Sequence, residues 1–139
     1  MLVDIILWGL VVGIAHFVVV GALYQNPAVA KMYNACQGEP GVKSWASKKA
    51  YVSWMFAGTQ VEVFILTGAY LFLRDFFPEQ SGTSTAWILG GLFAAIRVYP
   101  RFWTMWIQTS YPNRLLAIEF VNGTIGTFVI VLCLSLLPI

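Results

Sequence analysis

The stretch "LVDIILWGLVVGIAHFVVVGALY", residues 2–24, decides the fold class of this chain. Its length matches the roughly 20 apolar residues that cross the hydrocarbon core of a bilayer as an α-helix. It has no basic leader, it carries Asp4 near its start, and no small-x-small cleavage motif follows its apolar part. These features are typical of a retained membrane helix and not of a signal peptide.

Three more apolar runs follow, and together the four runs predict membrane spans near residues 3–24, 51–73, 85–108 and 115–138. The composition agrees, because 59% of the 139 residues are hydrophobic and only 10% are charged, against about 25% charged in soluble domains. The connections after the second and third runs are short, which favours antiparallel neighbours. We therefore expect an all-α integral membrane four-helix bundle with antiparallel up-down topology, forming a single transmembrane domain over residues 1–139.

The segment between the first two spans, "YQNPAVAKMYNACQGEPG" at residues 24–41, has the signals of a short helix. Asn26 followed by Pro27 is a favourable helix start, and Gly38 with Pro40 is a favourable stop. This segment also carries the first of several lysines, which suit a membrane surface. We expect a short interfacial helix here.

Basic residues gather in the loops that would share one face of the membrane. The loops at 25–50 and 109–114 hold Lys31, Lys43, Lys48, Lys49 and Arg114, whereas the loop at 74–84 holds Arg74 beside Asp75 and Glu79. By the positive-inside rule, the 25–50 loop is expected to be cytoplasmic and both termini to lie outside.

Two resemblances accompany this layout. The "GG…AAIR" of residues 90–97 and the "VNGTIGTF" of residues 121–128 resemble helices of small four-helix fluoride channels, but their order is reversed here, so no residue roles are carried over. The short helix after the first span, the proline in the third and the Glu-x-x-Asn in the fourth resemble uncharacterised small bacterial inner-membrane proteins. That second resemblance implies a location in the bacterial inner membrane.

Ionisable side chains fall inside all four predicted spans. Their positions are His16 in the first, Glu62 in the second, Arg97 and Arg101 in the third, and Glu119 in the fourth. An unpaired charge at the bilayer centre costs from about 2.5 to more than 10 kcal/mol, so such residues are expected to face one another. Small residues for helix packing share the same helical faces, and these are Gly9, Gly13, Gly58, Gly90, Gly123 and Gly126.

Counting about 1.5 Å per residue from the outer face places the polar side chains at similar depths, roughly 16 to 25 Å. The predicted substrate- or ion-binding candidates are therefore Arg97, Arg101, Glu62, Glu119, His16, Asn122 and Gln60. One hypothesis is a small transporter or channel, in which the arginines bind a small polar or anionic solute and the carboxylates, with His16, exchange protons. The alternative is a structural or accessory subunit of a larger membrane complex, whose buried ion pairs only fix helix packing. A lipid-modifying or quinone-using enzyme is a third, weaker hypothesis.

The third span is the least regular of the four. Its unbroken apolar part, "AWILGGLFAAI" at residues 86–96, is too short to cross a bilayer, and the following segment would otherwise lie flat at the interface. We expect a spanning helix kinked at Pro100, because proline removes one backbone hydrogen bond and obstructs the carbonyl of Ile96.

Several classes of site are excluded by the residues present. There is no lysine within a span for a retinal Schiff base, and a single histidine cannot provide bis-histidine haem ligation. Neither metal-ligand spacing nor a phosphate-binding or nucleophile motif occurs. We therefore expect no metal, no cofactor, no nucleic acid and no catalytic residue, with a homodimer or a larger membrane complex as partner.

Overall fold

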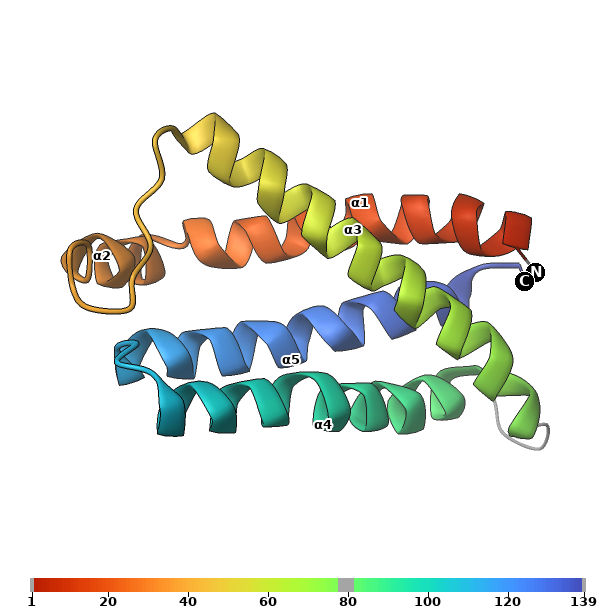
Figure 1. Ribbon diagram of the computed structural model, residues 1–139. Coiled ribbons are helices and arrows are strands. Elements are labelled where there is room, and N and C mark those ends of the chain that lie inside the picture. The colour runs from red at the N-terminus through yellow and green to blue at the C-terminus, as the bar shows by residue number, and fades with distance from the viewer. Residues whose placement is uncertain (1, 78–81, 139) are drawn as a thin grey trace.

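The computed structural model describes residues 2–77 and 82–138, and almost all of them are helical (Figure 1). Its elements are α1 (Leu2–Gln25), α2 (Pro27–Ala35), α3 (Lys48–Leu73) with a short 3₁₀ turn η1 (Arg74–Phe76), α4 (Gly82–Gln108) and α5 (Asn113–Leu136). The predicted all-α class and the short helix after the first apolar run are confirmed.

The short helix α2 begins where the sequence signals placed it. Asn26 is its N-cap, and the side-chain Oδ1 accepts a hydrogen bond from the Ala28 amide at 3.0 Å, while Pro27 occupies the first helical position. Beyond its end, Gly38 and Gly41 have φ values of 86° and 83°, in the left-handed region that glycine tolerates. These glycines let the chain turn back toward α3.

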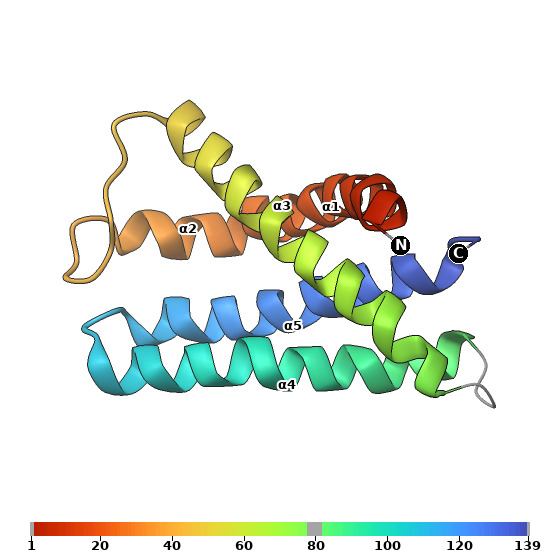
Figure 2. The same cartoon turned by 45° about the vertical axis from the view of Figure 1, so that its right-hand side comes forward.

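The long helices run in alternate directions (Figures 1 and 2). α4 and α5 lie side by side and antiparallel, α1 lies over α5, and α3 crosses the other helices obliquely. The start of α1, the end of α3 and the end of α5 lie at one end of the molecule, and α2 and the α4–α5 connection lie at the other, which we call the α2 end.

Three of these helices are long and apolar enough to cross a membrane, namely Leu2–Gln25, Lys48–Phe76 and Asn113–Leu136. They imply a lipid bilayer environment for the chain. α4 is not among them. Of the four predicted spans, three are therefore supported and the one at residues 85–108 is not. The physical reason is that the apolar run of α4 ends at Arg97, and Pro100 and Arg101 follow.

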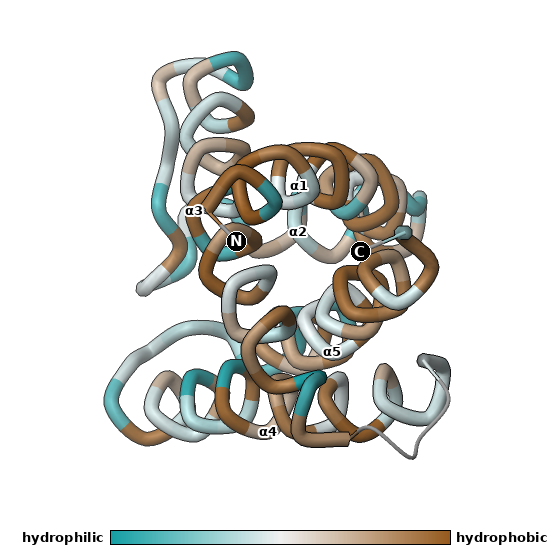
Figure 3. Tube along the Cα trace, turned by 90° about the vertical axis from the view of Figure 1, so that its right-hand side faces the viewer, coloured by the Kyte–Doolittle hydropathy of each residue, from teal (hydrophilic) through white to brown (hydrophobic). Residues whose placement is uncertain are grey.

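Helix α1 is packed in the manner of a membrane helix. It buries only Gly9, Val12, Gly13 and His16, and leaves most of its large aliphatic side chains exposed. In the end-on view of Figure 3, α1 is coloured hydrophobic along most of its length. An apolar outer surface around a stripe of small and polar residues suits lipid outside and helix contacts inside.

The apolar core occupies the half of the bundle away from the α2 end. Its members are Val12, Val63, Leu66, Tyr70, Ala86, Leu89, Phe93, Ile130, Val131 and Leu134. On α3, the buried residues begin only at Gln60, so the first twelve residues of that helix, Lys48 to Thr59, contribute none. The main apolar cluster therefore lies in one half of the bundle, and the start of α3 adds no buried residue to the other half.

Candidate functional site

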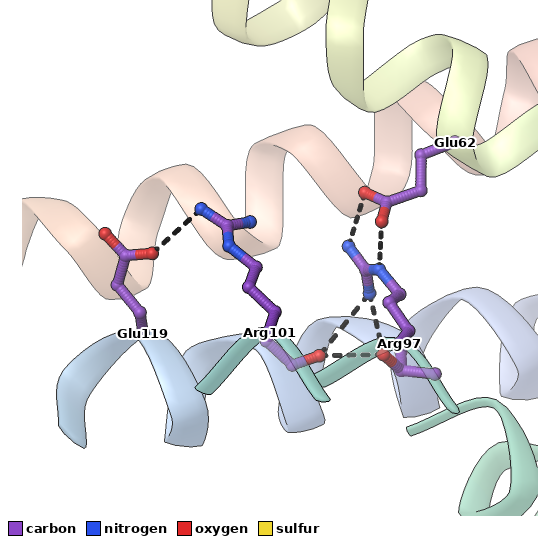
Figure 4. Close-up of polar contacts among 6 residues, drawn as sticks. Glu62, Arg97, Arg101 and Glu119 are labelled. Atoms are coloured by element: carbon purple, nitrogen blue, oxygen red, sulfur yellow. Dashed lines mark hydrogen bonds and ion pairs between the residues drawn. The ribbon is translucent and has the colours of Figure 1, made fainter. Parts of the chain in front are cut away.

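Arg97 joins three helices through one guanidinium group (Figure 4). Its Nε and Nη2 donate to the two carboxylate oxygens of Glu62 on α3, the second at 2.6 Å, and Nη1 donates to Thr127 Oγ1 on α5 at 2.7 Å. The same Nη1 reaches the Gly123 carbonyl at 3.5 Å. This two-pronged geometry is the strong form of an arginine–carboxylate pair. Arg97 is consequently held in one orientation by both neighbouring helices.

Arg101, one turn later on α4, makes a looser pair. Its Nη2 donates to Glu119 Oε2 on α5 at 3.1 Å, and its side chain is 69% exposed, whereas that of Arg97 is 21% exposed. No other hydrogen bond from the Arg101 guanidinium to the described part of the chain is found. Most of its donors therefore have no hydrogen-bond partner among the described residues.

Glu119 collects contacts from the α2 end. Its Oε1 accepts from the phenol of Tyr111 at 2.7 Å and from the phenol of Tyr33 on α2 at 3.2 Å. Burial, followed by the charge of Glu119, raises the pKa of Tyr33, and burial with the Glu119 hydrogen bond raises that of Tyr111. Both phenols thus remain neutral donors at physiological pH. Tyr33 links α2 to α5, and Tyr111 links the α4–α5 connection to α5.

The sequence brings these groups together through two facing stripes. Arg97 and Arg101 are four residues apart on α4, and Glu119, Gly123 and Thr127 recur every four residues on α5. Because the two helices run antiparallel, the later arginine meets the earlier residue of α5 and the earlier arginine meets the later ones.

A small cavity of about 60 Å³ lies between the two ion pairs. It is lined by both pairs and by Val98, Phe102, Met105, Leu116, Phe120 and Gly123. At about 30 Å³ of liquid volume per water molecule, it holds roughly two waters or one small ion. The cavity is therefore too small for a metabolite.

The three remaining candidates do not line this cavity. His16, 3% exposed, lies against Gly126 and interacts electrostatically with Arg97 and Glu62. Gln60 Nε2 donates to the Gly9 carbonyl at 2.9 Å. Asn122 lines a separate groove beside α1 and α2. The sequence predicted that all seven polar candidates would form one layer at a common depth. In the structure, four of them line the small cavity and three do not. Depth along the bilayer normal does not specify which side of a helix a residue occupies.

The predicted packing glycines differ in how closely they are approached. Built Cβ atoms on Gly9 and Gly13 would collide with Phe64 and the Gln60 amide, and those on Gly90 and Gly126 would lie 2.6 and 2.7 Å from Phe128 and His16. Gly123 is in ordinary contact with Val98 at 3.4 Å, and at Gly58 no described atom lies within 4 Å. Gly58 is exposed because the early part of α3 diverges from the bundle.

Sequence reasoning missed three residues of the site: Tyr33, Tyr111 and Thr127. Thr127 had a detectable signal, because it continues the four-residue spacing from Glu119 through Gly123. The tyrosines lie in non-spanning segments, and only the folded arrangement brings them to Glu119. α4 continues as a helix through Pro100, and the kink there stays a prediction.

The described residues contain no group of three or more histidine, cysteine or acidic side chains suited to a metal ion. Comparison of the chain with family models, with curated proteins and with solved structures gave no match. The chemistry of the site is therefore argued from its own geometry.

Proposed function

We propose that this protein is a small four-helix membrane channel or transporter, with α4 as the fourth span, that moves a small anion through the cavity between α3, α4 and α5. The observation that carries the proposal is the environment of Arg101. A mostly exposed guanidinium, with one described hydrogen bond, borders a cavity that also contains Arg97, Glu62 and Glu119. Such an arrangement presents free N–H donors to an anion at membrane depth.

Spanning by α4 is supported by the pairing of its charges. The 27 residues of α4 would extend about 40 Å, more than the hydrocarbon thickness. Its two arginines pair with carboxylates on α3 and α5, two helices that are themselves apolar enough to span. Pairing offsets much of the penalty for charges in lipid, which hydropathy alone does not take into account.

The two ion pairs differ in a way that suggests an order of events. An anion arriving from the α2 end meets the Arg101 guanidinium first and competes with Glu119, which keeps its two tyrosine donors. It then meets Arg97, whose guanidinium is occupied by Glu62. There the anion competes with the Glu62 carboxylate for two of the Arg97 donors.

A structural role in a larger complex is the second candidate function, and one observation favours it. Arg97 is satisfied by Glu62, Thr127 and the Gly123 carbonyl, which is how a permanent packing contact would be built. In that case the lysine-bearing segment between α2 and α3 would dock a partner. A second copy of the chain is a further expected partner. The Arg101 side chain is 69% exposed, and contact with another copy would keep its charge away from lipid.

Flux measurements on reconstituted vesicles separate the two functions. Vesicles loaded with potassium chloride or potassium nitrate are given a potassium ionophore, and anion efflux is followed with ion-selective electrodes. Arg101→Gln is expected to lower efflux at least tenfold with unchanged helix content and elution volume. Arg114→Gln is the matched control, since Arg114 pairs with Glu39 outside the cavity. Unchanged efflux in Arg101→Gln, or no efflux from the unmodified protein, would refute the channel or transporter.

A further inference from the structure

Four buried side chains have a nitrogen or oxygen atom with no hydrogen-bond partner among the described residues. They are Thr67 Oγ1, Gln60 Oε1, His16 Nδ1 and Asn122 Nδ2, in side chains that are 0%, 8%, 3% and 6% exposed. Buried polar atoms in folded proteins are nearly always paired, either with protein groups or with ordered water. We call these four residues the polar seam.

The polar seam follows α1 from its middle toward the α2 end. Thr67 lies beside Gly9, with its Oγ1 3.5 Å from the Cβ position there, and Gln60 contacts both Gly9 and Gly13. His16 comes one turn later on the same face of α1. Thr67, Gln60 and His16 are therefore associated with successive turns of α1, at Gly9, Gly13 and His16 itself.

The far end of the polar seam opens into a groove. His16 Nε2 is 2.7 Å from the Cβ position of Gly126 on α5, and Asn122 is one turn before Gly126. Asn122 also lines an open groove of about 530 Å³ formed with the end of α1 and the start of α2. Its lining residues are Val18, Val19, Ala22, Leu23, Asn26, Val29 and Asn122. This groove shares no lining residue with the cavity between the arginines.

We propose that the polar seam binds water that connects His16 to this groove, so that His16 exchanges protons with the α2 end of the bundle. The four side chains offer complementary chemistry to water: an amide donor at Asn122, an acceptor or donor at the imidazole, an acceptor at Gln60 and a hydroxyl at Thr67. In the uptake step, a hydronium ion in the groove loses a proton through the bound water to the free imidazole nitrogen. An O–H bond breaks, an N–H bond forms, and neutral imidazole becomes imidazolium. Release reverses the same step.

The location of His16 makes this exchange relevant to the arginine cavity. The charged groups that act on His16 are Arg97 from α4 and Glu62 from α3. A proton on His16 would add a second positive charge to the electrostatic interactions of that pair. The water route stands by itself, whereas its coupling to anion movement rests on the proposed function.

The chain contains one histidine, which makes the water route directly measurable. Protein with ¹⁵N-labelled imidazole, in phosphatidylcholine–phosphatidylglycerol nanodiscs, gives one pair of ring nitrogen signals, and magnetisation transfer from water reports bound water beside the ring. We expect strong transfer in the unmodified protein and at least a fivefold loss in Asn122→Leu, with Asn122→Ser retaining most of it.

The outcomes are distinct from those of the flux assay. Absence of water transfer to His16 in the unmodified protein would overturn the proposal, whatever the anion efflux. Equal transfer in Asn122→Leu and the unmodified protein would overturn the route through the groove. Arg101→Gln, which alters only the other cavity, is expected to leave the water signal unchanged even where it abolishes efflux.

Discussion

The Arg97–Glu62 pair is expected to be the strongest polar coupling in the bundle, and a double-mutant cycle measures it. Two fully buried charge-assisted hydrogen bonds contribute about 3 to 6 kcal/mol in total. The Glu62 side chain is 39% exposed and that of Arg97 is 21% exposed, so we reduce the expected coupling to about 2 kcal/mol. Interhelical polar contacts in a membrane protein average about 0.6 kcal/mol by the same method. The pair should therefore stand clearly above an ordinary contact.

The matched comparison is the Arg101–Glu119 pair, with one 3.1 Å hydrogen bond and a mostly exposed arginine. Its coupling is expected to be about 0.5 kcal/mol. Both cycles use glutamine at each position, and free energies of unfolding come from far-UV circular dichroism in mixed micelles of increasing SDS fraction. Equal coupling energies in the two cycles, or a value below about 0.6 kcal/mol for Arg97–Glu62, would refute the distinction between the two arginines. That distinction is that Arg97 is held by strong hydrogen bonds and Arg101 is held only weakly.

Three further changes probe other contacts. Gly13→Val should lower the free energy of unfolding by about 1 to 3 kcal/mol, because the added Cβ would collide with the Gln60 amide. Gly58→Val is the control and should be tolerated, since no described neighbour lies within 4 Å of its Cβ position. Equal losses of unfolding free energy in SDS would contradict this expectation. Because the pKa of Tyr111 is raised, the folded protein keeps a proton that the unfolded chain releases above about pH 10, so stability should fall there, and Tyr111→Phe should show a smaller fall in the same assay. Ser47→Ala removes the side chain that accepts from a first-turn amide of α3 at 3.1 Å and should cost about 1 kcal/mol, seen as a lower midpoint of thermal unfolding.

Features that depend on local sequence were predictable. The start of α2 follows from Asn26 and Pro27, whose capping and φ preference act within one turn, and the apolar lengths of α1, α3 and α5 follow from composition. The fourth predicted span, at residues 85–108, is not among the helices apolar enough to cross a membrane, because the charges of α4 count against it when their partners are ignored. Pairing is a tertiary property, and hydropathy measures each residue as though it stood alone.

In the candidate site, too, the sequence predicts what depends on one helix but not the contacts between elements. The four-residue spacings of α4 and α5 put Arg97, Arg101 and Glu119 on facing stripes, which periodicity can identify. Periodicity could not identify Tyr33, because it reaches Glu119 from an element 86 positions earlier in the chain. Nor could it separate His16 from the arginine cavity, since residues at equal depth on different helices are equivalent until the helix rotations are fixed.

The Arg97–Glu62 pair is what relates the two separated sets of polar residues. Both side chains line the small cavity on one side, and both act electrostatically on His16 on the other. A static packing contact needs no polar residues beyond its own partners, yet the polar seam also includes His16 and, at the groove, Asn122. Because unpaired polar atoms are unfavourable in a bundle surrounded by lipid, these four side chains are the basis for the water route that we propose between His16 and the α2 end. Glu62 thus belongs both to the pair that lines the small cavity and to the electrostatic environment of His16.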